Sequence, residues 1–142
     1  MKTINFLIFI SLFTIIFSSC NKYEEGPKIS FLSAKNRVAG DYTLAKYLVN
    51  GQEIILSDIG IAEYRKVYNA DGTGTSYVNL QERSFEWEFD EKKENIRERS
   101  QSTLGEWSDW SSYNQILKLT DNELWIIDNN SPETSEYHFI EQ

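Results

Sequence analysis

The clearest alternation of apolar and polar side chains lies near the middle of the chain. Phe85, Trp87 and Phe89 alternate with acidic residues, and a period of two places successive side chains on opposite faces of a β-strand. An amphipathic helix would need apolar residues three or four positions apart. The segment therefore predicts a strand with three aromatic rings on a buried face and carboxylates on a face exposed to water.

Similar patterns predict eight further short strands, separated by turns rich in Asn, Asp and Gly. Short links favour a meander, in which strands adjacent in sequence also pair in space. We therefore expect an all-β fold, namely an antiparallel up-and-down barrel of eight or so strands, with a sandwich as the alternative. The further strands are expected at residues 42–49, 53–56, 63–69, 75–80, 95–101, 113–120, 123–127 and 136–140.

The first twenty residues follow a different pattern. Lys2 precedes an apolar run over residues 4–17, and two serines then precede Cys20, the only cysteine of the chain. This pattern resembles a bacterial lipoprotein signal, in which the cysteine is lipidated after cleavage. A retained transmembrane helix would have a similar length but needs no cysteine at its end. We predict a signal peptide over residues 1–19 and lipid attachment at Cys20.

Lipidation predicts a location in the cell envelope, at the outer membrane, with acyl chains on Cys20 inserted in the bilayer. A single acyl chain binds reversibly, whereas two or three chains anchor a protein stably. Residues 20–39 would form the lipidated tether and a short helical lead-in, capped by Ser33. Lys22 and the acids after it resemble an export signal to the cell surface. A solvated spacer explains them equally well, so both interpretations stay open.

The remaining composition limits the domain count and the partners. Removing residues 1–19 leaves 13 basic and 22 acidic residues, a formal charge of 13 minus 22, or −9. Such a surface repels phosphate groups, so we expect no nucleic-acid partner. Residues 40–142 are long enough for one barrel domain and too short for two. With a single cysteine, the fold has no internal disulfide and depends on packing.

Several short segments resemble the lipocalin-like lipoproteins of Bacteroidota. Gly40, Asp41 and Tyr42 stand where lipocalins begin with Gly-x-Trp, with Tyr42 in place of the tryptophan. The resemblance implies a lipocalin-type barrel, closed at one end by the lead-in helix and attached through an acylated cysteine. It implies no catalytic residue and no particular ligand. The segments that carry it are residues 23–30, 35–42, 49–51, 89–90, 116–119 and 123–125.

No catalytic or metal-binding constellation is found in the sequence. His138 is the only histidine, and period two places it on the face opposite Tyr137 and Phe139, toward solvent. A histidine-rich zinc site is therefore impossible, and a lipidated cysteine is no nucleophile. We predict a protein that is not an enzyme and needs no cofactor. The candidate ligand-lining or core-lining residues are Tyr42, Phe85, Trp87, Phe89 and Trp125.

Residues 107–111 spell the pattern Trp-Ser-x-Trp-Ser. Cytokine receptors and thrombospondin-type repeats share this pattern, and in them tryptophans and arginines stack into a ladder. Both are disulfide-rich modules, so we interpret the match as a coincidence. Tryptophan is usually well buried, which favours core packing of Trp107 and Trp110 over an exposed aromatic contact.

Two functions from different classes follow. The first is a non-catalytic accessory or interaction module, whose rim and acidic surface contact an envelope protein or a glycan. The alternative is a binding protein that holds a small apolar ligand inside the barrel. An eight-stranded barrel either is filled by its own side chains or holds one small ligand. Three large rings on one strand face favour a filled barrel or a shallow pocket.

Overall fold

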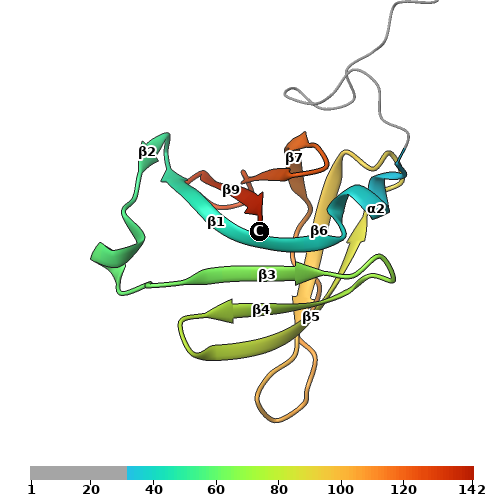
Figure 1. The fold of residues 1–142 in the computed structure, drawn as a ribbon, viewed down its shortest axis with the longest axis horizontal. Coiled ribbons are helices and arrows are strands. Elements are labelled where there is room, and N and C mark those ends of the chain that lie inside the picture. Colours follow the sequence, from blue (N-terminus) through green and yellow to red (C-terminus); the bar gives the residue numbers. More distant parts are fainter. Residues whose placement is uncertain (1–31) are drawn as a thin grey trace, which may run out of the picture.

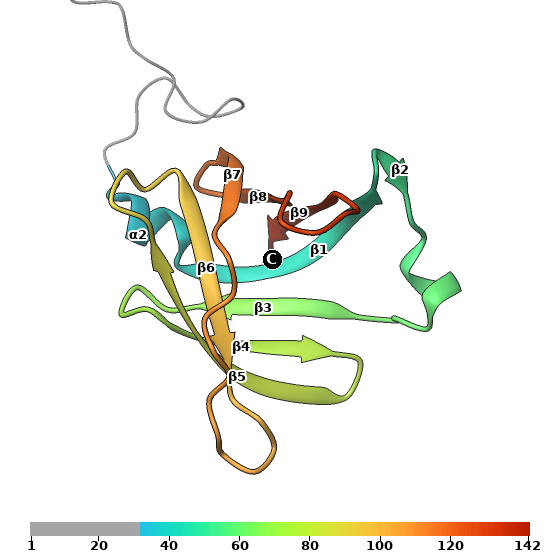
Figure 2. The same ribbon diagram turned by 180° about the vertical axis from the view of Figure 1, so that it is seen from behind.

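The computed structural model describes residues 32–142, which form a closed antiparallel barrel (Figures 1 and 2). Each strand from β3 to β9 pairs with its neighbour in sequence, and β9 pairs with β1 to close the barrel. The elements are α2 (Ala34–Val38), β1 (Gly40–Val49), β2 (Gln52–Glu53), the 3-10 turn η2 (Leu56–Ile59), β3 (Tyr64–Tyr68), β4 (Thr73–Val78), β5 (Gln81–Phe89), β6 (Asn95–Ser100), β7 (Asn114–Leu119), β8 (Glu123–Asp128) and β9 (Ser135–Glu141). Eight strands make the barrel and β2 extends one end of β1, which confirms the expected up-and-down fold.

The helix α2 closes one end of the barrel. The Ser33 side chain caps it by accepting a hydrogen bond from the Asn36 backbone, as its sequence predicts. Arg37 reaches across the end and donates to the carbonyl of Leu119 at 3.1 Å, while the Tyr42 hydroxyl donates to the Arg37 carbonyl at 2.8 Å. In Figure 1, β2 and η2 lie at the opposite end.

The half of the barrel near α2 is filled with apolar side chains. Tyr68 contacts Tyr42, Phe85 and Trp87 edge to face, with ring centres 5.0 to 6.1 Å apart. This geometry is preferred by aromatic pairs. The buried apolar residues are Ala34, Val38, Tyr42, Leu44, Tyr68, Phe85, Trp87, Ile96, Ile116, Leu119, Leu124, Ile126 and Phe139. The predicted strand with three inward rings is confirmed, with Phe89 half-buried beside the core.

A glycine makes room for one of these rings. Gly74 is the cross-strand partner of Phe85. A Cβ at this position would lie 2.3 Å from the Phe85 ring and 2.6 Å from the Val67 carbonyl. No side chain fits there, so the ring packs directly on the backbone of β4.

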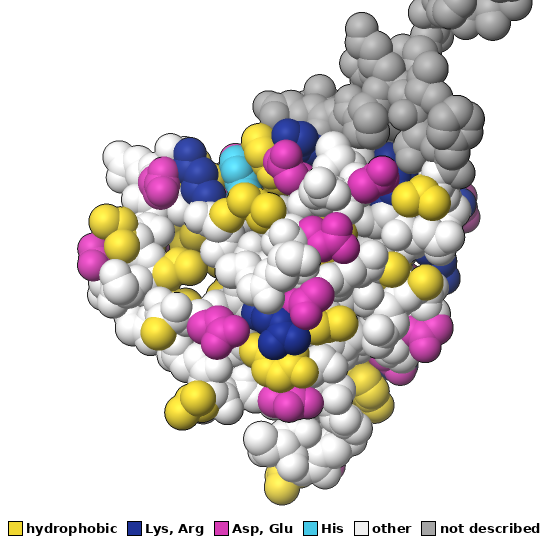
Figure 3. Space-filling view, viewed as in Figure 1, with side chains coloured by type: hydrophobic (Ala, Val, Ile, Leu, Met, Phe, Trp, Pro, Cys, Tyr) yellow, Lys and Arg dark blue, Asp and Glu magenta, His cyan; other side chains and the backbone are white. Residues whose placement is uncertain are grey.

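One expected strand is wrong. Residues 53–56 contain only the end of the two-residue strand β2 and the start of the η2 turn. The reason lies in the pairing of β1. It pairs with β3 only through Gly40–Thr43, and the rest of β1 pairs with β9. The chain after β2 must cross the resulting gap, and η2 ends at Gly60 in the left-handed region (φ 76°). The surface is hollowed on this side (Figure 3).

The inward aromatic face predicts a contrast between two neighbouring residues. Trp87 is 2% exposed and its indole donates to the carbonyls of Asn69 and Thr73, whereas Glu88 lies on the outer face. Trp87→Ala should lower the free energy of unfolding by about 3 to 5 kcal/mol through lost burial and the cavity left behind. Glu88→Ala should cost about 1 kcal/mol or less. Urea unfolding followed by circular dichroism measures both, and equal losses would contradict the strand register.

Candidate functional site

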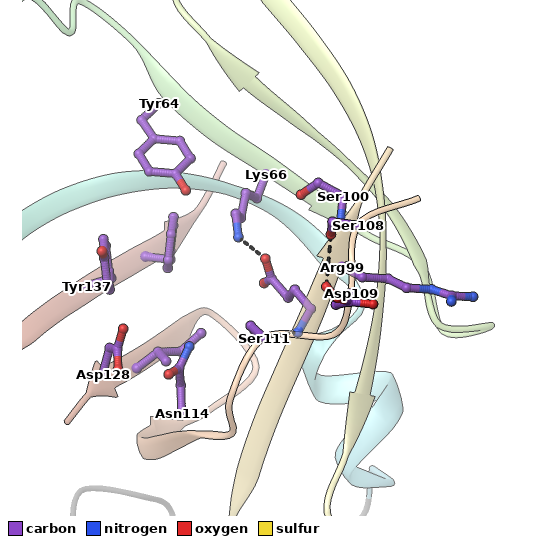
Figure 4. A pocket seen from close by; sticks show the side chains of 13 residues that line it. Tyr64, Lys66, Arg99, Ser100, Ser108, Asp109, Ser111, Asn114, Asp128 and Tyr137 are labelled. Carbon is purple, nitrogen blue, oxygen red and sulfur yellow. Dashed lines mark hydrogen bonds and ion pairs between the residues drawn. The ribbon is translucent and has the colours of Figure 1, made fainter. Parts of the chain in front are cut away.

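The open half of the barrel contains a cavity that is open to solvent. Two adjoining lobes of about 330 and 360 Å³ share Tyr64, Lys66, Glu98 and Ser100. One lobe extends toward β7, β8 and β9, and the other toward β4 and β5. Sites for small molecules typically measure roughly 300 to 1,000 Å³, so this space suits a small ligand. Figure 4 shows Tyr64, Lys66, Tyr137, Asn114 and Asp128 arranged around one lobe.

An ion pair between buried Lys66 and half-buried Glu98 forms the floor of the cavity. Lys66 is 8% exposed, and its Nζ lies 2.5 Å from Oε2 of Glu98. The other carboxylate oxygen of Glu98 accepts a hydrogen bond from the Tyr68 hydroxyl at 2.5 Å. The ammonium also lies 5.0 Å from the ring centre of Phe85, within the range of a cation–π contact. Both charges are therefore satisfied inside the barrel.

Burial and pairing keep Lys66 and Tyr68 in one protonation state near neutral pH. Desolvation lowers the pKa of Lys66, but attraction to Glu98 and the aromatic hydroxyls outweighs it, so the pKa is raised well above its ordinary value. Desolvation and then the charge of Glu98 raise the pKa of Tyr68 well above its ordinary value. Lys66 therefore stays charged and Tyr68 stays neutral across the physiological range.

Aromatic rings form another part of the cavity wall. Tyr64 contacts Phe139 edge to face at 5.8 Å, and Tyr137 stacks on Tyr47 at 5.0 Å. The Tyr47 hydroxyl lies 3.4 Å from the Ser135 hydroxyl. Desolvation, followed by the neighbouring Tyr47, raises the pKa of Tyr137 to about 12. The wall thus combines apolar rings with neutral hydroxyl groups.

The wall next to β6 is not a β-strand. Only Asn95 and Ile96 of β6 pair with β7, and residues 107–113 run beside the rest of β6. Ser108 and Ser111 replace a strand ladder there. The backbone N–H of Ser108 donates to the Ser100 carbonyl at 2.9 Å, and its hydroxyl accepts from the Ser100 N–H at 3.1 Å. Ser111 makes the same two bonds with Glu98, at 2.8 and 3.1 Å.

An arginine–aromatic ladder covers the outside of this wall. The Arg99 guanidinium lies 5.3 Å from the Trp107 ring centre and 4.9 Å from that of Trp110. The Arg97 guanidinium lies 5.1 Å from Trp110 and 4.6 Å from Tyr113. All four distances are within cation–π range. The three aromatic rings and two guanidinium groups therefore form one continuous stack along β6.

Two acids hold the arginines in place. Glu86 and Glu88 on β5 are the cross-strand partners of Arg99 and Arg97. The Nε atoms of both arginines lie 2.7 Å from these carboxylates. The polar face predicted for β5 thus has a structural role that the alternation alone does not indicate.

The expected core packing of the two tryptophans is wrong. Trp107 is 40% exposed, and Trp110 is half-buried in the ladder on the outer face. The interpretation of the Trp-Ser-x-Trp-Ser match as a coincidence stays a prediction, although this segment does form a tryptophan–arginine ladder without any disulfide. The physical reason is that cation–π contacts and serine hydrogen bonds suffice to hold this segment against β6.

The predicted site residues separate into two groups. Tyr42, Phe85 and Trp87 are buried in the core and Phe89 packs against it, while Phe85 also lines one lobe of the cavity. Trp125 does not join the core. It lies on the outer face, between Lys118 and His138. Cys20 lies outside the described residues.

His138 is on the outer face, as predicted, but other side chains cover it. Its ring stacks on Trp125 with centres 3.9 Å apart and planes 6° from parallel. Its Nε2 atom contacts the carboxylate of Glu136. The histidine therefore has no access to the cavity.

The ion pair at the cavity floor was missed in the sequence, although a signal for it exists. Lys66 lies between Tyr64 and Tyr68 at the inward positions of β3, and Glu98 lies between Ile96 and Ser100 on β6. A charge on an otherwise apolar face indicates a buried partner. The opposite charges of Lys66 and Glu98, each at an inward position of its strand, indicate that the two residues pair with each other.

Within residues 32–142, no group of three or more His, Cys, Asp and Glu side chains could hold a metal ion. The same part of the chain contains no helix long and apolar enough to cross a membrane.

The ion pair predicts that the free energy of unfolding depends strongly on Lys66. Lys66→Met leaves the Glu98 carboxylate in the barrel without its counter-ion, which should lower the free energy of unfolding by about 3 to 5 kcal/mol. Lys46→Met is the matched control, because its pair with Glu53 is exposed and should cost about 1 kcal/mol or less. Urea unfolding of both variants measures the difference. Equal effects would mean that the pair at the floor has no special role in stability.

The serine pairing predicts a local effect on hydrogen exchange. Ser111→Ala removes the hydroxyl that accepts from the Glu98 N–H, so the Glu98 amide should exchange faster, by roughly fivefold if opening costs about 1 kcal/mol less. Ser112→Ala changes the neighbouring exposed serine and should leave that amide unaffected. NMR-detected exchange resolves the two cases, and unchanged protection in Ser111→Ala would show that the hydroxyl contributes nothing to the wall.

Comparisons of the chain with protein-family models, with curated proteins and with solved structures find no match. The resemblance to lipocalin-like lipoproteins therefore stays a prediction from the residues.

Proposed function

We propose that the protein is a lipid-anchored, non-catalytic binding module of the cell envelope that holds a small polar molecule in the open half of its barrel. The observation that supports this most is the cavity above the Lys66–Glu98 pair, with lobes of about 330 and 360 Å³. A pocket with a few convergent polar groups is the default site for a ligand.

The lining favours a polar ligand over the apolar one that the sequence suggests as an alternative. Tyr64, Ser100 and Asn114 contribute hydroxyl and amide groups, and the paired charges of Lys66 and Glu98 lie at the floor. An apolar molecule would leave these groups without hydrogen bonds to water, which is costly. A polar molecule can form the hydrogen bonds that the displaced water formed.

The titratable groups support binding rather than catalysis. A general acid or base works best with a pKa near the operating pH. The pKa values of Lys66 and Tyr68 are instead raised well above their ordinary values, and His138 lies outside the barrel. None of these groups is suited to exchanging a proton with a ligand at neutral pH.

The envelope location rests on the lipoprotein-like signal and Cys20. Cys20→Ala should release the protein from the membrane fraction or leave it uncleaved, because no acyl chain can then be attached. Fractionation with mass spectrometry measures both. Unchanged membrane association at unchanged mass would contradict the anchor without affecting the cavity.

A filling variant tests binding in the cavity. Ser100 faces both lobes, so Ser100→Phe should occupy the space, whereas Ser84→Phe places the same ring on the exposed face of β5. We expect small polar fragments to shift the NMR signals of Tyr64, Lys66 and Ser100 in the unmodified protein and in Ser84→Phe, and to lose binding in Ser100→Phe. Fragment binding that persists in a folded Ser100→Phe variant would place the site elsewhere.

An interaction module is the second candidate, and one surface feature favours it. The loop that follows β6 projects beyond the barrel, with Leu104 87% exposed at its tip and Trp107 40% exposed at its base. In an interaction module these two side chains would supply the apolar contact with the partner. Leu104→Ser should then weaken such a contact without changing ligand binding in the cavity.

A further inference from the structure

Eight of the eighteen residues that line the two lobes are uncharged and can form hydrogen bonds. They include hydroxyls that both donate and accept, and amides that can do either at different atoms. Such a lining matches a ligand that itself carries many donors and acceptors. The uncharged polar residues of the two lobes are Tyr64, Ser76, Gln81, Ser100, Asn114, Tyr137, Ser108 and Ser111. The hydroxyls of Ser108 and Ser111 are already hydrogen-bonded within the wall.

The charges near the floor are already paired. Lys66 and Glu98 neutralise each other at 2.5 Å, and Arg99 is directed outward to Glu86. Glu98 uses one oxygen for Lys66 and the other for Tyr68. A charged ligand at this depth would meet no unpaired counter-ion, and burying its charge would cost several kcal/mol. A neutral ligand avoids this cost.

The charges nearer the solvent do not change this conclusion. Arg83 is exposed at the end of one lobe, and Asp109 is exposed beside the other. Asp128 uses one carboxylate oxygen to accept from the Asn130 backbone at 2.8 Å. Arg83 and Asp109 lie in water of high dielectric constant, where they select weakly among ligands. Asp128 is half-buried, and the same oxygen also accepts from the Asn130 side chain at 3.0 Å.

Aromatic rings supply the apolar part of the lining. Tyr64, Tyr137 and Phe139 come from two strands and lie next to the hydroxyl groups of the wall. A lining of this kind suits a compact ring that has C–H surfaces as well as hydroxyl groups around its edge. Each lobe, at about 330 or 360 Å³, is at the lower end of the range for ligand sites, so a ligand that occupies one lobe is small.

We propose that the cavity binds a neutral, polyhydroxylated ring compound of monosaccharide size. This inference rests on the proposed binding function and names its ligand class. The rings of Tyr64 and Tyr137 contact the C–H surfaces, while Lys66, Glu98 and Ser100 hydrogen-bond the hydroxyl groups at the floor. The remaining hydrogen-bonding capacity of the paired Lys66 and Glu98 lets them contact a hydroxyl without losing each other.

The experiment uses the intact protein in lipid nanodiscs, with saturation-transfer NMR and isothermal titration calorimetry. The neutral probes are D-glucose, D-galactose, D-mannose, N-acetyl-D-glucosamine and myo-inositol. The charged probes of the same size are D-galacturonate and D-glucosamine. We expect at least one neutral probe to bind, and its charged analogue to bind at least tenfold more weakly.

Two variants locate the binding. Tyr64→Phe removes one hydroxyl inside the cavity, and Tyr77→Phe removes one on the outer face, where Tyr77 lies under Arg65. Both substitutions keep the ring, so the barrel is retained. The affinity for the neutral probe should fall roughly fivefold in Tyr64→Phe, the effect of one lost hydrogen bond, and stay unchanged in Tyr77→Phe.

The outcomes separate this inference from the proposed function. Preferred binding of a charged probe, or no binding of any neutral probe, overturns the ligand class. If polar fragments still shift the signals of Tyr64 and Ser100 in that case, the binding function stands. If neither sugars nor fragments bind in the cavity, both proposals fall.

Discussion

The ion pair between Lys66 and Glu98 is the constraint on which the rest of the barrel depends. Two charges inside a protein must be paired and hydrogen-bonded, and apolar packing alone cannot replace water around them. From the side of the core, the Tyr68 hydroxyl donates a hydrogen bond to the Glu98 oxygen that Lys66 does not contact. The barrel can therefore be densely packed on one side of the pair and remain hollow on the other. The cavity begins where the apolar core ends.

The arginine–aromatic ladder stabilises the part of β6 that does not pair with β7. Without it, one wall of the cavity would have unpaired backbone groups and no cover. The serines supply side-chain acceptors for the β6 amides, and the stacked Trp and Arg side chains hold the segment from outside. Successive residues of β6 therefore point alternately to the cavity and to the ladder. Glu98 faces the cavity, whereas Arg97 and Arg99 belong to the ladder.

Much of the fold could be predicted from local patterns. The alternation around Trp87 identified an inward aromatic strand, and Asn50 and Gly51 form a tight turn with positive φ, as their sequence indicates. The cap at Ser33 also formed where expected. These features depend on backbone conformation and on the two-residue period of a strand, which are local properties. The candidate site was not predictable in the same way, because its floor joins β3 to β6 across the barrel.

The sequence by itself determined the all-β class, the meander order and the side of most strands that faces the core. Only the tertiary structure decided the rest. A register shift between Leu44 and Lys46 brings Tyr47 to the same face as Leu44, so strict alternation fails in β1. Likewise, no local pattern distinguishes a tryptophan in the core from Trp110 stacked outside on Arg97 and Arg99. The physical reason is that partner choice across a closed sheet depends on register and closure, which are set by all strands together.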